Sequence, residues 1–290
     1  MEKIGLVLEG GGVRGAYTAG ALAWLSENHI TFDYHVGISS GAVYLCCYLT
    51  GKTQSAKNMA TIYAADPKLV GIYALLHCGY YVDYRKIFKE DLIEKEQLSM
   101  KKIKEEHMPM EVGAYDLGKG ETVYFGSQDL DENLDLLRGT CALPVASEVV
   151  DYHGLRLLDG GITKMIPIER ALEQGCTKAL VITTKPATFV RKPSSKIVRF
   201  MMKHLYKECP QVEKDYAVRH INYYKQRKII DDMVEKGTAV NIYPSREIKV
   251  SRWKGDPERC TELYTLGYQD MEAHKEEILK FLDKGGEGNE

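Results

Sequence analysis

The sequence predicts an α/β protein in which buried strands are followed by glycine-rich turns and helices. Residues 4–8 and 178–184 are short, continuous apolar runs, which are typical of strands that are covered on both faces. Residues 32–38 are also strand-like, and an apolar, helix-compatible run at 42–49 follows them directly. Repetition of strand, turn and helix along one chain is the pattern of the α/β class.

The composition fits a globular protein and excludes several classes of function. The 290 residues suffice for one large domain, or for one domain with an appendage. Because 39 basic residues are balanced by 41 acidic ones, giving a formal charge of −2, we expect no nucleic-acid partner. The seven cysteines form no C-x-x-C pair, so we expect reduced thiols, a cytoplasmic location and no metal site. We expect no signal peptide, and no apolar window approaches the ~18 residues of a membrane span.

Between the first strand and a helix-compatible segment at 16–27 lies the glycine-rich loop Gly10-Gly11-Gly12-Val13-Arg14-Gly15. The amides of such a loop can converge on one point and bind negative charge. A P-loop is excluded because the required Lys followed by Ser or Thr is absent. Three interpretations remain: an oxyanion hole, a dinucleotide pyrophosphate site of the G-x-G-x-x-G type, and a packing loop without a ligand.

The position of an acidic residue near the second strand distinguishes between two of these interpretations, the dinucleotide site and the oxyanion hole. A dinucleotide site needs an acid about 20 positions further on, at the end of a strand. Asp33 has roughly that spacing, but it begins the second strand and does not end one. We therefore favour an oxyanion hole. Within it, Arg14 either bonds the carbonyls of the loop, which we favour, or contacts the substrate.

The second strand runs into Gly37-Ile38-Ser39-Ser40-Gly41, which has the G-x-S-x-G pattern of a nucleophile elbow. In such a turn the serine has strained backbone geometry and an accessible hydroxyl. The two glycines remove Cβ atoms that would clash across the turn. The helix N-terminus beneath Ser39 favours negative charge on a carbonyl oxygen under attack. Ser39 is therefore a candidate nucleophile, and an ordinary strand–helix turn is the alternative.

A further strand at 154–158 ends in Asp159, after which Gly160 and Gly161 turn the chain sharply. The carboxylate thus lies at a strand terminus, as Ser39 does, and active-site groups of open α/β sheets collect at that edge. The alternative is that Asp159 only bonds its own turn, as the aspartate of an Asp-Gly pair often does.

The other elements before residue 190 follow from composition and periodicity. Apolar runs bounded by turn residues predict strands, and charged segments with apolar residues at helical spacing predict helices. By these criteria we expect strands at 108–115 and 121–125, and helices at 66–78, 84–106, 133–139 and 169–174.

The glycine-rich loop, the serine elbow and Asp159-Gly160-Gly161 resemble, in type, order and spacing, the motifs of the patatin-like phospholipase family. Cys141-Ala-Leu-Pro144 and Pro167 also resemble its pattern. The resemblance covers roughly residues 4–185. It implies a three-layer α/β/α fold around a mostly parallel sheet, with lipid acyl hydrolase activity and no metal or other cofactor.

By position, the resemblance also implies the roles of single residues. Ser39 takes the nucleophile position and Asp159 the base position of a Ser–Asp dyad without histidine. The residues that fall in the oxyanion hole are Gly10, Gly11, Gly12 and Arg14. The glycines that complete the three motifs are Gly15, Gly37, Gly41, Gly160 and Gly161.

The implied dyad needs a carboxylate that is basic near neutral pH. A solvated aspartate has a pKa of about 3.9, and we expect burial beside Leu157 and Ile162 to raise the pKa of Asp159. A Ser-His-Asp triad is the alternative. None of the eight histidines lies at an obvious strand end after Asp159, and we expect His204 and His220 on the surface of helices.

Residues 191–290 are expected to form a mostly helical region packed on a hydrolase domain of residues 1–190. Residues 191–207 contain six basic residues and no acid, and a helix at about 195–207 would be amphipathic. We favour packing of its apolar face on the domain; contact with an anionic membrane surface or a lid role is the alternative. Further on, we expect helices at 215–236 and 259–282 and a strand at 240–244.

These features predict a serine acyl hydrolase that cleaves lipid carboxylic esters, of the phospholipase A or lysophospholipase kind, through an acyl-enzyme. Two alternatives stay open: an acyltransferase with the same dyad, and a nucleotide-binding or catalytically silent module built on the glycine-rich loop. The expected partner is a lipid or acyl-ester substrate. Peripheral contact with the inner face of the membrane through residues 191–207 is a further hypothesis.

Overall fold

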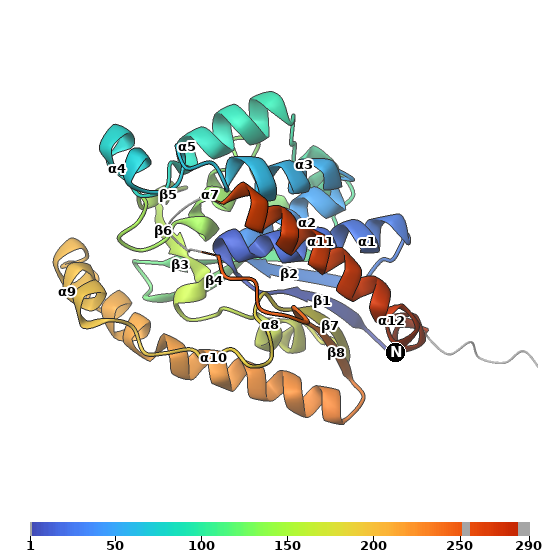
Figure 1. The fold of residues 1–290 in the computed structure, drawn as a ribbon. Coiled ribbons are helices and arrows are strands. Elements are labelled where there is room, and N and C mark those ends of the chain that lie inside the picture. Colours follow the sequence, from blue (N-terminus) through green and yellow to red (C-terminus); the bar gives the residue numbers. More distant parts are fainter. Residues whose placement is uncertain (1, 251–255, 284–290) are drawn as a thin grey trace, which may run out of the picture.

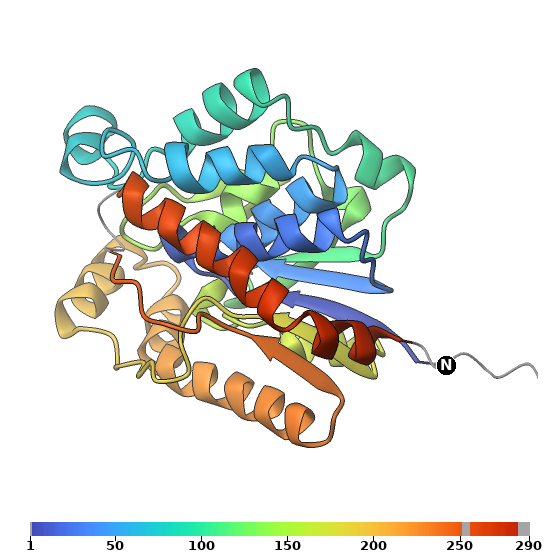
Figure 2. The same ribbon diagram turned by 45° about the vertical axis from the view of Figure 1, so that its right-hand side comes forward.

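A mixed sheet of eight strands forms the centre of the computed structural model, which describes residues 2–250 and 256–283 (Figures 1 and 2). Five of these strands run parallel to one another. Across the sheet they are β3 (Met110–Asp116), β2 (Tyr34–Ile38), β1 (Ile4–Leu8), β7 (Lys178–Ile182) and β8 (Ala239–Ile242). The prediction of a mostly parallel sheet is therefore confirmed.

The other three strands pair antiparallel with their neighbours: β4 (Glu121–Gly126) and β6 (Leu155–Asp159) with β3, and β5 (Val150–Tyr152) with β6. β4 pairs with residues 111–116 of β3 and so occupies one of its edges. β2 pairs with residues 110–113 and β6 with residues 114–116, so both must share the other edge. The carboxyl ends of β2 and β6 therefore meet end to end, because Gly113 is opposite Ile38 and Ala114 is opposite Asp159.

Helices cover both faces of the sheet, as the three-layer fold requires. Alternate residues of β1 point to opposite layers: Leu6 and Leu8 join a core with α1 (Ala16–Glu27) and α2 (Ser40–Leu49). Val7 joins a second core, on the opposite face. That core includes residues of α8 (Ile168–Glu173) and α10 (Gln211–Glu235), and Figure 1 shows α10 across the sheet from α1 and α2.

The C-terminal hundred residues are joined to this fold at two places. β8, which corresponds to the strand predicted at 240–244, pairs with β7 at the sheet edge, and α11 (Pro257–Ala273) packs on α1. The predicted helix at 259–282 is two helices, because α12 (Lys275–Leu282) begins after a break at His274. Residues 251–255 and 284–290 of the predicted region 191–290 lie outside the described residues. No helix in the described ranges has a stretch long and apolar enough to cross a bilayer.

Two helical predictions in the middle of the chain were wrong in extent. The predicted helix at 66–78 forms only α4 (Ile72–Cys78), because Gly71 has a φ of 124°, which a helix cannot contain. The predicted helix at 84–106 is interrupted at Gln97, whose φ is 53°. Its pieces are α5 (Tyr84–Lys86), the π-helix η3 (Ile87–Lys95) and α6 (Lys101–Glu105).

The shorter helices complete the chain. A helix that the sequence did not predict consists of α3 (Thr53–Asn58) and its π-helical continuation η2 (Met59–Tyr63). Single 3-10 turns lie at the glycine-rich loop, after β4 and after β6. They are η1 (Gly12–Gly15), η4 (Ser127–Asp129) and η5 (Gly160–Ile162), and the remaining helices are α7 (Asp135–Cys141) and α9 (Lys196–Leu205).

The contact between α1 and α11 depends on two glycines that allow the helix backbones to approach. A Cβ atom at Gly267 would lie 2.0 Å from the carbonyl oxygen of Tyr17, and one at Gly20 would lie 1.9 Å from that of Tyr264. The hydroxyl of Tyr17 also donates a hydrogen bond to Asp270 (3.0 Å). This crossing fixes the C-terminal region on the helix that follows the glycine-rich loop.

We predict that Gly267→Ala lowers the free energy of unfolding by about 2 kcal/mol or more, because the new methyl group would overlap backbone atoms that cannot move aside. Urea denaturation followed by circular dichroism measures the change. Gly126→Ala is the matched control: its Cβ would have only one neighbour within 4 Å, at 3.9 Å, so we expect a change under about 1 kcal/mol. Equal changes for the two variants would contradict the proposed close packing.

Candidate active site

Ser39 lies in the turn between β2 and α2, with the strained backbone that the elbow pattern predicted. Its φ and ψ are 55° and −130°, which non-glycine residues rarely adopt. A Cβ atom at Gly37 would lie 2.8 Å from the backbone of Ala42, so this glycine is needed for the sharp turn. Thr140, a buried residue of α7, accepts the Ser39 N–H (3.0 Å) and donates to the Gly113 carbonyl (2.5 Å). The elbow is therefore bonded to β3 through Thr140, a residue that no sequence pattern had indicated.

Asp159 lies beside this turn at the end of β6. Because β6 runs antiparallel to β3 and hence to β2, it does not share the strand direction that the sequence argument assumed. The carboxyl end of β6 nevertheless lies beside that of β2, because β3 extends beyond the end of β2 and β6 pairs with this extension. Asp159 also bonds its own turn, as the alternative interpretation proposed: its Oδ1 accepts the Gly161 N–H (2.7 Å). A Cβ atom at Gly160 would lie 2.4 Å from the Gly113 carbonyl oxygen, so the turn packs closely on β3.

The carboxyl of Asp159 is almost fully buried, and its pKa reflects several opposing effects. Burial is the largest and raises the pKa above its usual range, in the direction that the sequence predicted. The Arg219 guanidinium, the hydroxyl of Ser39 and the N–H of Gly161 each lower the pKa, but less than burial raises it. Asp159 is therefore a stronger base than a solvated aspartate and lies close enough to Ser39 to respond to its hydroxyl.

The glycine-rich loop faces the same site, and its amides have different partners. The N–H of Gly10 donates to the Met165 carbonyl (2.9 Å), and that of Gly11 donates to the Ser40 hydroxyl (3.1 Å). Gly12, with a φ of 57°, has no acceptor for its N–H among the described residues. Of the three predicted glycine donors, Gly12 is thus the one whose amide is unbonded in this arrangement. The other motif glycines, Gly15, Gly41 and Gly161, lie where a Cβ would approach another atom within 3.0 Å.

Asp33, which a dinucleotide site would need, lies elsewhere. Its Oδ2 accepts the N–H of Ile4 (2.8 Å), at the start of β1. The glycine-rich loop follows the other end of that strand. Asp33 therefore cannot bind a ribose that is held by this loop.

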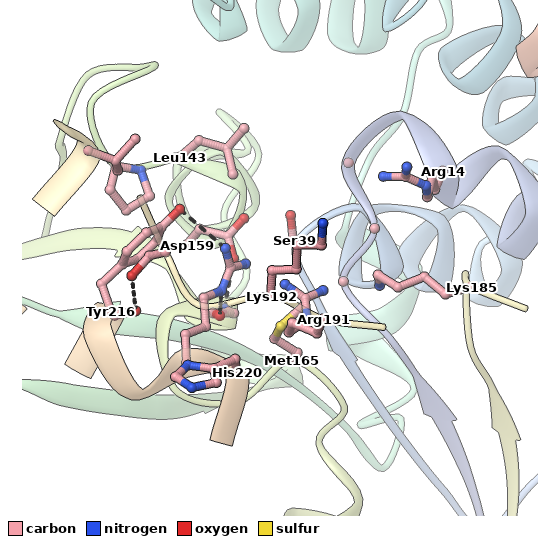
Figure 3. Close-up of a pocket in the computed structure, with 18 of the residues that line it drawn as sticks. Arg14, Ser39, Leu143, Asp159, Met165, Lys185, Arg191, Lys192, Tyr216 and His220 are labelled. Carbon is pink, nitrogen blue, oxygen red and sulfur yellow. Dashed lines mark hydrogen bonds between the residues drawn. The ribbon is translucent and has the colours of Figure 1, made fainter. Parts of the chain in front are cut away.

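A pocket of about 510 Å³ opens over Ser39 and Asp159 (Figure 3). The glycine-rich loop and Arg14 form one part of its wall, and Leu143 and Pro144 form another. Much of the remaining wall comes from two parts of the chain, of which the sequence analysis connected only residues 191–207 with the site, as a possible lid. They are the segment after β7, with Lys185, Arg191 and Lys192, and helix α10, with Tyr216, Arg219 and His220.

The position of His220 corrects one expectation. It was predicted on the helix surface, but it is only partly exposed and lines the pocket, with no hydrogen-bond partner for its Nδ1 among the described residues. His204 is exposed, as predicted.

Arg219 connects α10 with the carboxyl group. Its Nε donates to the Gly161 carbonyl (2.5 Å), and its Nη1 donates to the Tyr216 hydroxyl (3.4 Å). Because the Gly161 N–H in turn donates to Asp159, Arg219 holds the turn that carries the carboxylate. No local pattern in the sequence indicated this residue, since its position depends on how α10 packs against the sheet.

A buried ion pair fixes the pocket wall behind the glycine-rich loop. Glu9, fully buried, accepts hydrogen bonds from Lys185 Nζ and from the Thr184 N–H (2.6 Å) and hydroxyl (3.0 Å). Burial lowers the pKa of Lys185 to about 7, although Glu9 opposes this change. The residue that precedes the loop is therefore tied to the end of β7, a role that the sequence analysis did not assign to it.

The fold and these motifs define a class of three-layer α/β/α proteins with a serine elbow and an Asp-Gly-Gly turn at one place in the sheet. The chain belongs to the patatin-like phospholipase family, whose model matches residues 6–172. Residues 209–283 match a domain of unknown function, DUF6363.

The chain is also similar to two individual proteins. The uncharacterized protein YjjU of Escherichia coli is 26% identical over 205 residues, which are 66% of this chain. The chain spans about half of that relative, 54% of its length. The crystal structure of VipD from Legionella pneumophila matches 96% of this chain and 67% of that one, with a TM-score of 0.52 at 13% identity. The VipD likeness concerns the fold alone.

We predict that Arg219→Gln raises the pKa of Asp159 further, because it removes the cation that opposes burial. Carbon-13 NMR titration of the aspartate carboxyls measures the pKa, with Asp159→Asn to assign the signal. Arg219→Lys keeps the charge and should give a pKa closer to the wild type. Lys225→Gln, an exposed change on the same helix, is the control for loss of one charge. An unchanged pKa in Arg219→Gln would contradict the prediction.

Proposed function

We propose that this chain is a serine acyl hydrolase that cleaves lipid carboxylic esters, of the phospholipase A or lysophospholipase kind. The observation that supports the proposal most is the shared pocket of Ser39, Asp159 and the unbonded amide of Gly12. A hydroxyl, a buried carboxylate and a backbone donor are the groups that an acyl transfer to water requires. The family assignment makes a lipid ester the first substrate to consider.

In the proposed acylation step, Ser39 Oγ attacks the carbonyl carbon of the ester while Asp159 accepts its proton. The raised pKa of Asp159 makes this transfer easier than it would be to a solvated aspartate. Gly12 donates its N–H to the oxygen that becomes negative, and the N-terminus of α2 adds a favourable dipole. Asp159 then returns the proton to the leaving alcohol, and the acyl group stays on Ser39.

In the proposed deacylation step, a water molecule takes the place of the alcohol. Asp159 removes a proton from this water, the resulting hydroxide attacks the acyl-enzyme, and the proton passes to Ser39 Oγ as the fatty acid leaves. Arg219 acts on both steps through Asp159, because it holds the Asp159 turn and keeps the pKa of the carboxyl from rising further.

We predict that Ser39→Ala and Asp159→Asn each lower kcat for p-nitrophenyl butyrate about 10⁴-fold or more, because nucleophile and base act as one unit. A chromogenic assay measures kcat, and circular dichroism shows whether the variants are folded. A fluorophosphonate probe should label the wild type but not Ser39→Ala. The exposed Ser245→Ala is the matched control and should retain full labelling.

His220 provides the test between dyad and triad. If the proposed dyad acts without histidine, His220→Gln retains turnover well above that of Ser39→Ala. Loss of turnover in folded His220→Gln to the level of Ser39→Ala would replace the dyad with a triad, and an unlabelled Ser39 in the wild type would reject the hydrolase.

Peripheral membrane contact through α9 is part of this proposal. The apolar face of α9 was expected to pack on the domain, and only part of it does. Met202 is buried, whereas Ile197, Phe200 and Leu205 are 72%, 62% and 62% exposed. The same helix carries basic side chains, which suits an anionic lipid surface.

A second helix with exposed apolar residues lies on the same side of the molecule. In α4, Ile72 and Leu76 are 67% and 77% exposed. Figures 1 and 2 both show α4 and α9 projecting on the side away from the labelled N-terminus. Val198 of α9 lines the pocket, so a membrane that contacted these helices would bring lipid esters to its entrance.

We predict that Ile197→Ser/Phe200→Ser lowers binding to vesicles of phosphatidylglycerol and phosphatidylcholine about tenfold, because two apolar side chains would no longer enter the bilayer. Co-sedimentation measures the bound fraction. Leu279→Ser, which removes an exposed apolar residue from α12, is the control and should bind like the wild type. Equal binding of both variants, or no dependence on anionic lipid, would contradict the membrane hypothesis.

A further inference from the structure

Positive charge is concentrated in the pocket, although the chain as a whole carries a formal charge of −2. A single residue among those that line the pocket is acidic, the buried Asp159. Five are basic and come from three separate parts of the chain: the glycine-rich loop, the segment after β7 and α10. They are Arg14, Lys185, Arg191, Lys192 and Arg219. A cleft with one sign of charge attracts a ligand of the opposite sign.

Two of these cations are already committed to parts of the site. Arg219 holds the Asp159 turn, and Lys185 is paired with the buried Glu9. Arg219 thus balances the charge of Asp159 within the pocket, and Lys185 balances that of Glu9 behind the pocket wall. Arg14, Arg191 and Lys192 add further positive charge to the lining, so the pocket carries more positive than negative charge. Arg191 also lies near enough to Glu9 to lower the pKa of that carboxyl.

Arg191 is held in place by aromatic rings. Its guanidinium lies 4.6 Å from the ring centre of Tyr223 and 5.6 Å from that of Phe189, and its backbone N–H donates to the Tyr224 hydroxyl (2.9 Å). Stacking uses the flat face of a guanidinium, whereas phosphate binding uses its N–H edge, so one does not prevent the other. Lys185 lies over the same Tyr223 ring, at 5.6 Å, which places both cations at one part of the pocket.

The pocket also has an apolar component, which includes Leu143, Pro144 and Val198. Figure 3 shows Leu143 on the other side of Ser39 from Arg14 and Lys185, on the side of Tyr216 and His220. An ester bound at Ser39 can therefore place its acyl chain toward Leu143 and its alcohol part toward Lys185 and the neighbouring Arg191. A head group with an ammonium group would face charges of the same sign.

We propose that the pocket selects acyl esters whose alcohol part carries a phosphate without a compensating cation, as in an anionic glycerophospholipid. This inference rests on the proposed hydrolase function and specifies its substrate class. Arg191 and Lys192 form the phosphate subsite. Arg191 contributes its guanidinium to this subsite, and the exposed Lys192 contributes a second positive charge.

The test compares two soluble lipids that differ only in the head group, dihexanoylphosphatidylglycerol and dihexanoylphosphatidylcholine. Both are used below their critical micelle concentrations, so that binding to a lipid surface cannot contribute. The products, hexanoate and the lysophospholipid, are measured by mass spectrometry. We expect the wild type to have a kcat/KM about tenfold or more higher for the anionic lipid.

In Arg191→Gln/Lys192→Gln the ratio of the two kcat/KM values should fall about tenfold, because the phosphate loses both cations. Lys225→Gln, which removes one exposed charge outside the pocket, should keep the wild-type ratio. Equal kcat/KM values for both lipids in the wild type, or a ratio that survives the double substitution, would overturn the inference.

Two further measurements show whether the hydrolase function, the phosphate subsite or the lipid source of the phosphate is the part that fails. Hydrolysis of p-nitrophenyl butyrate, lost in Ser39→Ala, tests the hydrolase alone; if it is present without head-group preference, only the phosphate subsite is wrong. Hexanoyl-coenzyme A is a soluble acyl donor that also carries phosphates. If its kcat/KM exceeded that of dihexanoylphosphatidylglycerol, the lipid source of the phosphate would be wrong.

Discussion

The candidate site depends on how one edge of β3 is divided between two strands. β2 pairs with the first part of that edge and β6 with the last, and they approach from opposite directions. Their carboxyl ends must therefore meet, which brings Ser39 and Asp159 together although 120 residues separate them in sequence. A slip of either strand by one residue would turn its side chains to the other face of the sheet and separate the two groups. Sheet register, more than loop conformation, determines the geometry of the site.

The same meeting of strands explains the environment of Asp159. Two strand ends and the Asp-Gly-Gly turn pack against β3 with no room for a Cβ at Gly160, so water has little access to the carboxyl. Burial makes the carboxyl a better base, but it would keep an isolated carboxyl protonated if nothing opposed it. Arg219 limits that effect from outside the sheet. Two opposing effects thus set the pKa of Asp159. Close packing at Gly160 raises the pKa by burying the carboxyl, and Arg219 of α10 lowers it.

The sequence predicted the parts of the molecule whose signals are local. Strand, glycine turn and helix follow one another within about 25 residues at the loop and at the elbow, and both were placed correctly. The direction of β6 was not predictable, because nothing within residues 154–161 records which strand they pair with. Arg219 and His220 were missed for the same reason: they enter the pocket only because α10 packs across the sheet. The helix boundaries at Gly71 and Gln97 depend on single residues with positive φ, which periodicity does not detect.

The region of unknown function is structurally continuous with the site. Residues 209–283 contribute the edge strand β8, helix α11, which packs on α1, and the pocket residues Tyr216, Arg219 and His220. The glycine-rich loop lies between β1 and α1, and α11 packs on α1, so the C-terminal region supports both walls of the pocket. Arg219 of α10 bonds the Asp159 turn and lowers the pKa of the carboxyl at the end of β6, so both matched regions of the chain contribute to the candidate site.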